Sequence, residues 1–233
     1  DLIFENYRHR FKEYEDKIIY NPVSEVELRE LKSKKWFNYV SNFNIPLPHK
    51  HKGKSARKIH NSLKREINHR DSAILGFFNL ALPHDYILLS DLDEIPNPVA
   101  IETTIKNSIS KPHYFKMNWY LYWINNQVSQ DWYGTVLFKF KELKGSSLDN
   151  LRFASSKASE VPGKIVDGGG WHFSYIGGSE AIKKKLQAHP FQGYKAFIAI
   201  WLDRLKIRKF KNSLKNNKDI LMQNRTFTKV KID

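Results

Sequence analysis

The 233-residue sequence contains no cysteine, which excludes disulfides, cysteine-ligated zinc and thiol nucleophiles and suits a reducing compartment. It contains no apolar run of 18 residues or more, so no transmembrane helix is expected within this stretch. No signal-peptide pattern opens it. Because internal repeats and low-complexity linkers are also lacking, we expect a single α/β domain over residues 1–233, ending in a basic helix and tail over 195–233.

Acidic residues are scarce relative to basic ones: 24 Asp and Glu face 39 Lys and Arg, a net charge of +15. This excess fits either a polyanionic partner, such as nucleic acid, an anionic membrane face or a phosphorylated ligand, or a solubilising surface. The distribution is uneven. Eight basic residues lie between Lys50 and Arg70, whereas none lies between Asp71 and Ile105. A basic arm therefore runs into an acidic segment.

The pattern of apolar residues and turn formers predicts alternating helices and strands. The run Tyr86–Leu89, flanked by helical segments, is typical of a buried strand of the parallel type. We expect helices over 6–16, 24–39, 55–80, 98–108, 179–188 and 194–214, and strands over 17–20, 86–89, 113–123 and 132–140.

Three carboxylates follow the predicted strand 86–89 within four residues: Asp91, Asp93 and Glu94. Ligands of open α/β sheets bind just past the carboxyl ends of strands, and hard divalent cations prefer oxygen ligands. In an extended segment Asp91 and Asp93 point to the same side and can reach one metal, while Leu92 packs into the sheet. The alternative is an ordinary solvated turn, because Asp, Asn and Pro are common turn residues.

A glycine-rich stretch over 167–178 is the second candidate site. Three consecutive glycines allow the backbone to approach a ligand closely. After them, aromatic residues alternate with His172 and Ser174, so His172 can be a metal ligand or a phosphate contact. A structural histidine and a plain glycine loop are the alternatives.

Other aromatic residues are frequent over 114–140, where they either shape an acceptor site or fill the core. The candidates for the acceptor site are Trp119, Tyr122, Trp123 and Trp132.

These two stretches together resemble the signature segments of glycosyltransferase family 17, the family of the β-1,4-mannosyl-glycoprotein 4-β-N-acetylglucosaminyltransferase. The matching residues run from Leu88 to Pro98 and from Gly169 to Tyr175. Residues 65–76 and 2–19 are also similar to family segments, so the resemblance spans about 1–188. The resemblance implies a GT-A-like α/β fold with a mixed central sheet. It also implies an inverting, metal-dependent transfer of a sugar from a nucleotide-diphosphate donor to a glycan acceptor. N-acetylglucosamine is one candidate for the sugar, with UDP-GlcNAc as the donor.

The resemblance also implies roles for individual residues. Asp91 and Asp93 would hold Mn²⁺ or Mg²⁺ on the donor diphosphate, with His172 as a further ligand. Inversion requires a general base for the acceptor hydroxyl, for which Glu94 and Asp167 are the candidates. The donor-binding residues predicted on this basis are Arg65, Arg70, Asp91 and Trp171.

The sequence departs from the family pattern in three places. The family's first strand–helix–strand unit would precede Asp1 and is not in this sequence, which fits either a trimmed chain or an incomplete enzyme. The family's His-Gln-Glu appears here as Phe191-Gln192-Gly193, and the basic loop 44–57 is additional. A degenerate relative that binds a donor without turnover is therefore one alternative. A basic nucleic-acid-binding module is another, although a phosphate backbone would avoid the acidic segment. For a bacterial or viral chain we expect a cytoplasmic location or peripheral contact with an anionic membrane.

Overall fold

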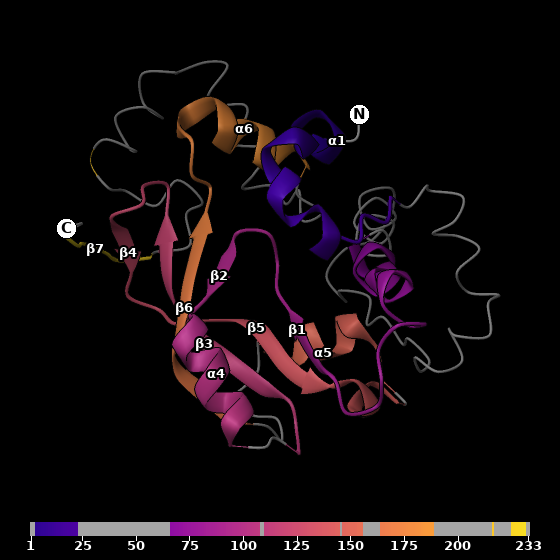
Figure 1. Cartoon of the computed structure of the whole chain (residues 1–233). Helices are drawn as coiled ribbons and strands as arrows, with labels where there is room; N and C mark the ends of the chain where they lie inside the picture. The colour runs from indigo at the N-terminus through magenta and orange to yellow at the C-terminus, as the bar shows by residue number, and fades with distance from the viewer. Residues whose placement is uncertain are drawn as a thin grey trace, which may run out of the picture.

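The computed structural model describes residues 3–22, 66–107, 110–144, 146–155, 164–188, 216 and 225–231. Within these residues the chain forms a seven-stranded sheet with helices packed against it (Figure 1). The predicted mixed α/β class is confirmed at this level. None of the helices in the described ranges is long and apolar enough to cross a membrane.

The elements follow one another in the order of the chain. The strands are β1 (Tyr86–Leu89), β2 (Glu94–Pro96), β3 (His113–Leu121), β4 (Asn126–Val128), β5 (Trp132–Lys139), β6 (Lys164–Ser174) and β7 (Phe227–Lys229). The helices are α1 (Ile3–Tyr7), α4 (Pro98–Lys106), α5 (Leu148–Ser155) and α6 (Gly178–Ala188), with 3-10 helices η1 (Arg8–Lys17), η4 (Ala73–Gly76) and η5 (Phe140–Leu143). Residues 66–72 are also helical.

The long strand β3 organises the sheet because it has neighbours on both edges. It pairs antiparallel with β5 and β4 and parallel with β6. The sheet continues from β5 to β1, from β6 to β2 and from β4 to β7, each pair antiparallel. The sheet is therefore mixed, with β3 and β6 as the parallel pair among the described strands. The β2–β6 register sets Glu94 opposite His172, which brings the acidic segment beside the glycine-rich stretch.

Alternation of side chains along β5 gives the sheet two apolar faces. Val136 and Phe138 belong to a core cluster that includes Leu148 and Leu151 of α5. Leu137, between them, belongs to a second cluster against which α4 packs. These two layers cover β5 on both faces, and Figure 1 shows α4 and α5 beside this part of the sheet.

Most predicted elements are confirmed, with ends that differ by a few residues. The strands over 113–123 and 132–140 and the helices over 98–108 and 179–188 correspond to β3, β5, α4 and α6. The predicted helix over 6–16 is present as α1 followed by η1, with a kink at Phe11. Helix α4 begins where the sequence indicates, because the Asn97 side chain accepts a hydrogen bond from the Val99 N–H at 3.1 Å and Pro98 occupies the first turn.

Three local predictions are wrong. The predicted strand over 17–20 is absent, since residues 18–22 carry no regular structure after η1. The predicted end of the helix over 55–80 is also wrong: residues 66–72 are helical and η4 ends at Gly76, while residues 55–65 lie outside the described residues. Strand β1 is antiparallel to β5 rather than of the parallel type, because an apolar run specifies a strand but not the direction of its neighbour. The predicted helices over 24–39 and 194–214 and the loop 44–57 lie outside the described residues.

Candidate functional site

The acidic segment forms a tight turn between β1 and β2. The Glu94 N–H donates to the Asp91 carbonyl at 3.0 Å, which closes a four-residue turn. Leu92, at the tip of this turn, is fully exposed, so the expectation that it packs into the sheet is wrong. That expectation assumed an extended chain after β1, whereas the turn reverses the chain so that β2 can pair with β6.

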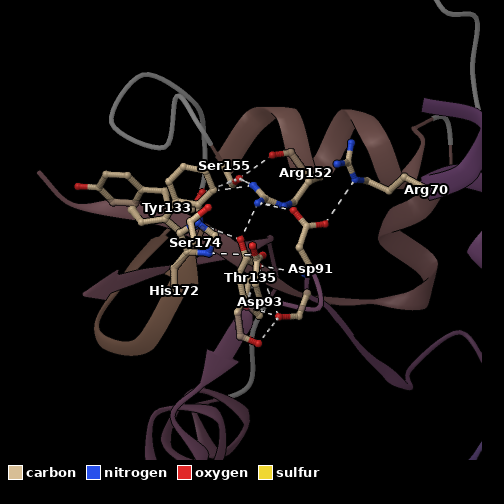
Figure 2. A network of polar contacts seen from close by, with 12 residues as sticks. Arg70, Asp91, Asp93, Tyr133, Thr135, Arg152, Ser155, His172 and Ser174 are labelled. Carbon is tan, nitrogen blue, oxygen red and sulfur yellow. Dashed lines mark hydrogen bonds and ion pairs between the residues drawn. The ribbon is translucent and has the colours of Figure 1, made fainter. Parts of the chain in front are cut away.

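The turn sends Asp91 and Asp93 to different cationic partners. Figure 2 shows the Asp91 carboxylate between Arg70 and Arg152. Asp91 contacts Arg152 Nη2 at 2.8 Å and Arg70 Nε at 3.8 Å. Asp93 accepts from Lys185 Nζ at 2.7 Å. The extended-strand argument predicted that the two carboxylates point to the same side. In the structure they instead contact different cationic side chains. Their mutual repulsion is offset by cationic side chains from 66–72, α5 and α6.

Glu94 is buried at the centre of the network, with its side chain fully shielded from solvent. Its Oε1 accepts from Arg152 Nη2 at 2.6 Å and from Trp132 Nε1 at 2.7 Å. Its Oε2 accepts from the Asp91 backbone N–H at 3.1 Å. Burial raises the pKa of Glu94, and Arg152 opposes this rise. This geometry favours a positioning role for Glu94, which holds the turn; its role as a general base stays a prediction.

Gly134 makes room for this arrangement on β5. A Cβ at Gly134 would lie 2.2 Å from Glu94 Oε1 and 2.6 Å from Trp132 Nε1. Such distances are far inside van der Waals contact, so a larger residue would displace the carboxylate or the indole. The glycine is required by the buried hydrogen bonds, not by a turn.

His172 lies beside Asp93, on the side of β6 that faces Trp132. Its ring stacks on the Trp132 indole, with centroids 4.1 Å apart and planes at 10°. Burial lowers the pKa of His172 to about 4, so the ring is neutral at pH 7. Its Nδ1 is buried without a hydrogen-bond partner in the described part of the chain and lies 3.6 Å from Asp93 Oδ1, too far for a hydrogen bond.

The pair Asp93 and His172 offers two ligand atoms, 3.6 Å apart, to a divalent cation. Neighbouring octahedral ligands at about 2.1 Å from an ion are roughly 3.0 Å apart, so binding would draw the two side chains closer together. An unpartnered nitrogen on a neutral imidazole is the form that binds metals. Within the described residues no group of three or more His, Cys, Asp or Glu residues is arranged for a metal.

Of the two arginines predicted to bind the donor, the structure describes Arg70. Arg65 lies outside the described residues. The Arg70 guanidinium contacts three carboxylates, those of Glu66, Asp91 and Asp149. Arg70 thus joins the network of the acidic turn and ties it to α5.

Asp167 and Trp171 lie apart from this network. Asp167 is exposed on β6 and contacts Lys116 Nζ at 3.5 Å. Trp171 precedes His172 on the same strand, so alternation directs its indole to the opposite face of the sheet, where it is 38% exposed. The structure therefore separates Trp171 from Asp91, although both were predicted to bind the donor.

Arg152 and Lys185 belong to the site but were not singled out from the sequence. A signal for Arg152 exists: it lies in α5 on the helical face marked by Leu148, Leu151 and Ser155, all buried. A charged residue on an apolar helix face needs a buried partner. Lys185 ends a run of three lysines, and nothing local distinguishes it from Lys183 and Lys184.

The aromatic residues near the site divide between core and network. Trp119 and Tyr122 are buried in a cluster with Ile182 of α6, as the core alternative predicted. Trp132 donates to Glu94 and supports His172. Trp123 is 43% exposed.

Asp71, next to Arg70, gives the fold a measurable pH dependence. It is buried, accepts from the Asp149 N–H at 2.9 Å, and burial raises its pKa from 3.8 to about 7. The folded chain therefore binds this proton more readily than the unfolded chain between pH 4 and 7. We expect the contribution of Asp71 to the unfolding free energy to fall by about 4 kcal/mol as pH rises across that window and to level off above it.

Urea unfolding at several pH values would measure this effect. The difference in unfolding free energy between wild type and Asp71→Asn isolates the contribution of the Asp71 carboxyl, because the amide does not titrate. Asp16→Asn, at an exposed position on η1, is the matched control. A difference between wild type and Asp71→Asn that does not vary with pH would contradict the assignment.

Comparison of this chain with protein-family models, with curated proteins and with solved structures finds no match in any of the three.

Proposed function

We propose that this chain is a metal-dependent glycosyltransferase that moves a sugar from a nucleotide-diphosphate donor to a glycan acceptor. The observation that carries the proposal is the pair formed by Asp93 Oδ1 and the unpartnered His172 Nδ1, 3.6 Å apart. The resemblance of the two segments that supply these residues to glycosyltransferase family 17 supports the same conclusion. The GT-A-like fold is part of this proposal.

Asp93 and His172 would hold Mn²⁺ or Mg²⁺. When bound, the ion would neutralise the negative charge that develops on the departing diphosphate. Asp91 has a different task in this arrangement, because its carboxylate is engaged by Arg152 and Arg70. Through that contact Asp91 fixes the turn that presents Asp93.

Cationic side chains surround the proposed donor site. The Lys185 ammonium contacts the Asp93 carboxylate, which would hold the ion, and lies 3.2 Å from Ser174 Oγ. Arg70, half-buried beside Asp91, adds a guanidinium that favours phosphate oxygens. Both cations are paired with carboxylates, Lys185 with Asp93 and Arg70 with Glu66, Asp91 and Asp149, so a donor diphosphate and its ion would compete for these contacts.

Two alternatives are a degenerate relative that binds a donor without turnover and a nucleic-acid-binding module. The contact between Lys185 and Asp93 also fits a degenerate relative in which the ammonium takes the place of the ion. The nucleic-acid alternative depends on the basic arm and the C-terminal helix, which lie mostly outside the described residues.

The test uses the full chain and a panel of UDP- and GDP-sugars. We expect release of nucleoside diphosphate with Mn²⁺ and its loss with EDTA. Calorimetry with UDP and GDP, with and without Mn²⁺, provides a readout independent of turnover. Metal-dependent binding without release would assign the degenerate relative. Absence of both would overturn the proposal.

A further inference from the structure

A cavity of about 390 Å³ lies at the sheet surface around Trp171. Its volume falls within the range of about 300–1,000 Å³ that is usual for small-molecule sites. The polar and aromatic residues that line it come from β3, β6 and the segments beside β2 and β5: Asn97, Lys116, Asn118, Asp131, Asp167 and Trp171. The residues of the proposed donor site are not among them.

Trp171 supplies the apolar surface of the cavity. In the sheet register it lies between Ile95 of β2 and Asn118 of β3. Ile95 is 52% exposed and Trp171 38%, so part of the indole is accessible beside an aliphatic side chain. An exposed aromatic ring of this kind presents a flat apolar face to the C–H groups of a ligand.

Polar groups surround this ring on one side. Asp131 and Asp167 both contact Lys116, whose Nζ lies 3.2 Å from Asp131 Oδ2 and 3.5 Å from Asp167 Oδ1. The lysine holds the two carboxylates near each other at the cavity. Ionised carboxylates accept up to four hydrogen bonds each, so oxygens are left to accept from ligand hydroxyls. The Asn118 amide adds both a donor and an acceptor.

The charge of the cavity selects against anions. Two carboxylates and one ammonium leave it with a net negative charge, although the chain as a whole carries +15. A sulfated, phosphorylated or uronic ligand would meet two carboxylates here. A neutral polyol that combines an apolar ring face with equatorial hydroxyls matches both the indole and the acceptors.

From this combination we infer that the cavity around Trp171 is a binding site for a neutral pyranoside unit. Its ring lies against the Trp171 indole, and its hydroxyl groups donate to Asp131 and Asp167. Because Trp171 and His172 face opposite sides of β6, this site is distinct from the Asp93–His172 pair. The inference does not require the proposed transferase activity.

Titration of the full chain with methyl glycosides of glucose, galactose, mannose and N-acetylglucosamine tests this inference. Saturation-transfer NMR and calorimetry would report binding. We expect at least one of the four to bind, and Trp171→Ala to weaken its binding about tenfold or more. Asp167→Asn, at a highly exposed position that does not endanger folding, is expected to weaken it about threefold or more.

Matched controls separate the site from other surfaces. Trp123→Ala removes another exposed tryptophan and should leave binding within about twofold of wild type. Asp93→Asn should also leave glycoside binding within about twofold of wild type, so loss of transferase function and loss of this site are distinguishable. Binding of none of the four glycosides, undiminished binding in both Trp171→Ala and Asp167→Asn, or tighter binding of a sulfated disaccharide or an arginine peptide would overturn the inference.

Discussion

Replacing Arg152 with alanine is expected to lower the unfolding free energy by about 3–5 kcal/mol. Arg152 is 8% exposed, and its Nη2 contacts both Glu94 and Asp91. Its Nη1 donates to Ser155 Oγ at 2.8 Å. Removing the guanidinium leaves the fully buried carboxylate of Glu94 without a counter-charge, which costs far more than the loss of an exposed ion pair.

Urea unfolding followed by circular dichroism would measure this loss. Arg8→Ala is the matched control, because Arg8 pairs with Glu5 and Glu15 on the surface and should change stability far less than Arg152→Ala does. Combining Arg152→Met with Glu94→Gln should recover part of the loss, since no lone charge is then buried. A loss below about 1 kcal/mol in Arg152→Ala would show that the buried pair does not form.

Replacing Asp93 with alanine is expected to lower Mn²⁺-dependent release of nucleoside diphosphate by about 100-fold or more. This expectation rests on the proposed function. Asp93 is the acidic residue of the turn that lies against the unpartnered His172 Nδ1, and its carboxylate is the charged member of the proposed ligand pair. His172→Ala should lower release in the same way, while Asp93→Asn retains an oxygen but loses the charge.

Mn²⁺ binding, measured by electron paramagnetic resonance, provides a second readout. Both alanine variants should bind the ion more weakly than wild type while keeping their circular dichroism spectra. Glu102→Gln, on the exposed face of α4, is the matched control because it removes one carboxylate away from the site. Full release and unchanged Mn²⁺ affinity in Asp93→Ala and His172→Ala would remove these residues from the metal site.

Much of the local structure could be predicted from the sequence because its signals are short-range. Asn97 and Pro98 mark the start of α4 through the chemistry of one helical turn. The aromatic runs over 113–123 and 132–140 identify β3 and β5 through their content of β-forming residues. The conformation after β1 was predicted wrongly for the same reason: Asp91-Leu92-Asp93 fits a strand as well as a turn, and the pairing of β2 with β6 decides between them.

By itself the sequence determined the mixed α/β class, the acidic segment after an apolar strand and the alternation that separates His172 from Trp171. Only the tertiary structure decided which charges pair. Arg152 reaches Asp91 across 61 positions, and Lys185 reaches Asp93 across 92. Spacing along the chain specifies local backbone conformation and the face on which a residue lies. The partner of a buried charge depends on how distant elements pack, because desolvation penalises every carboxylate that is left without a cation.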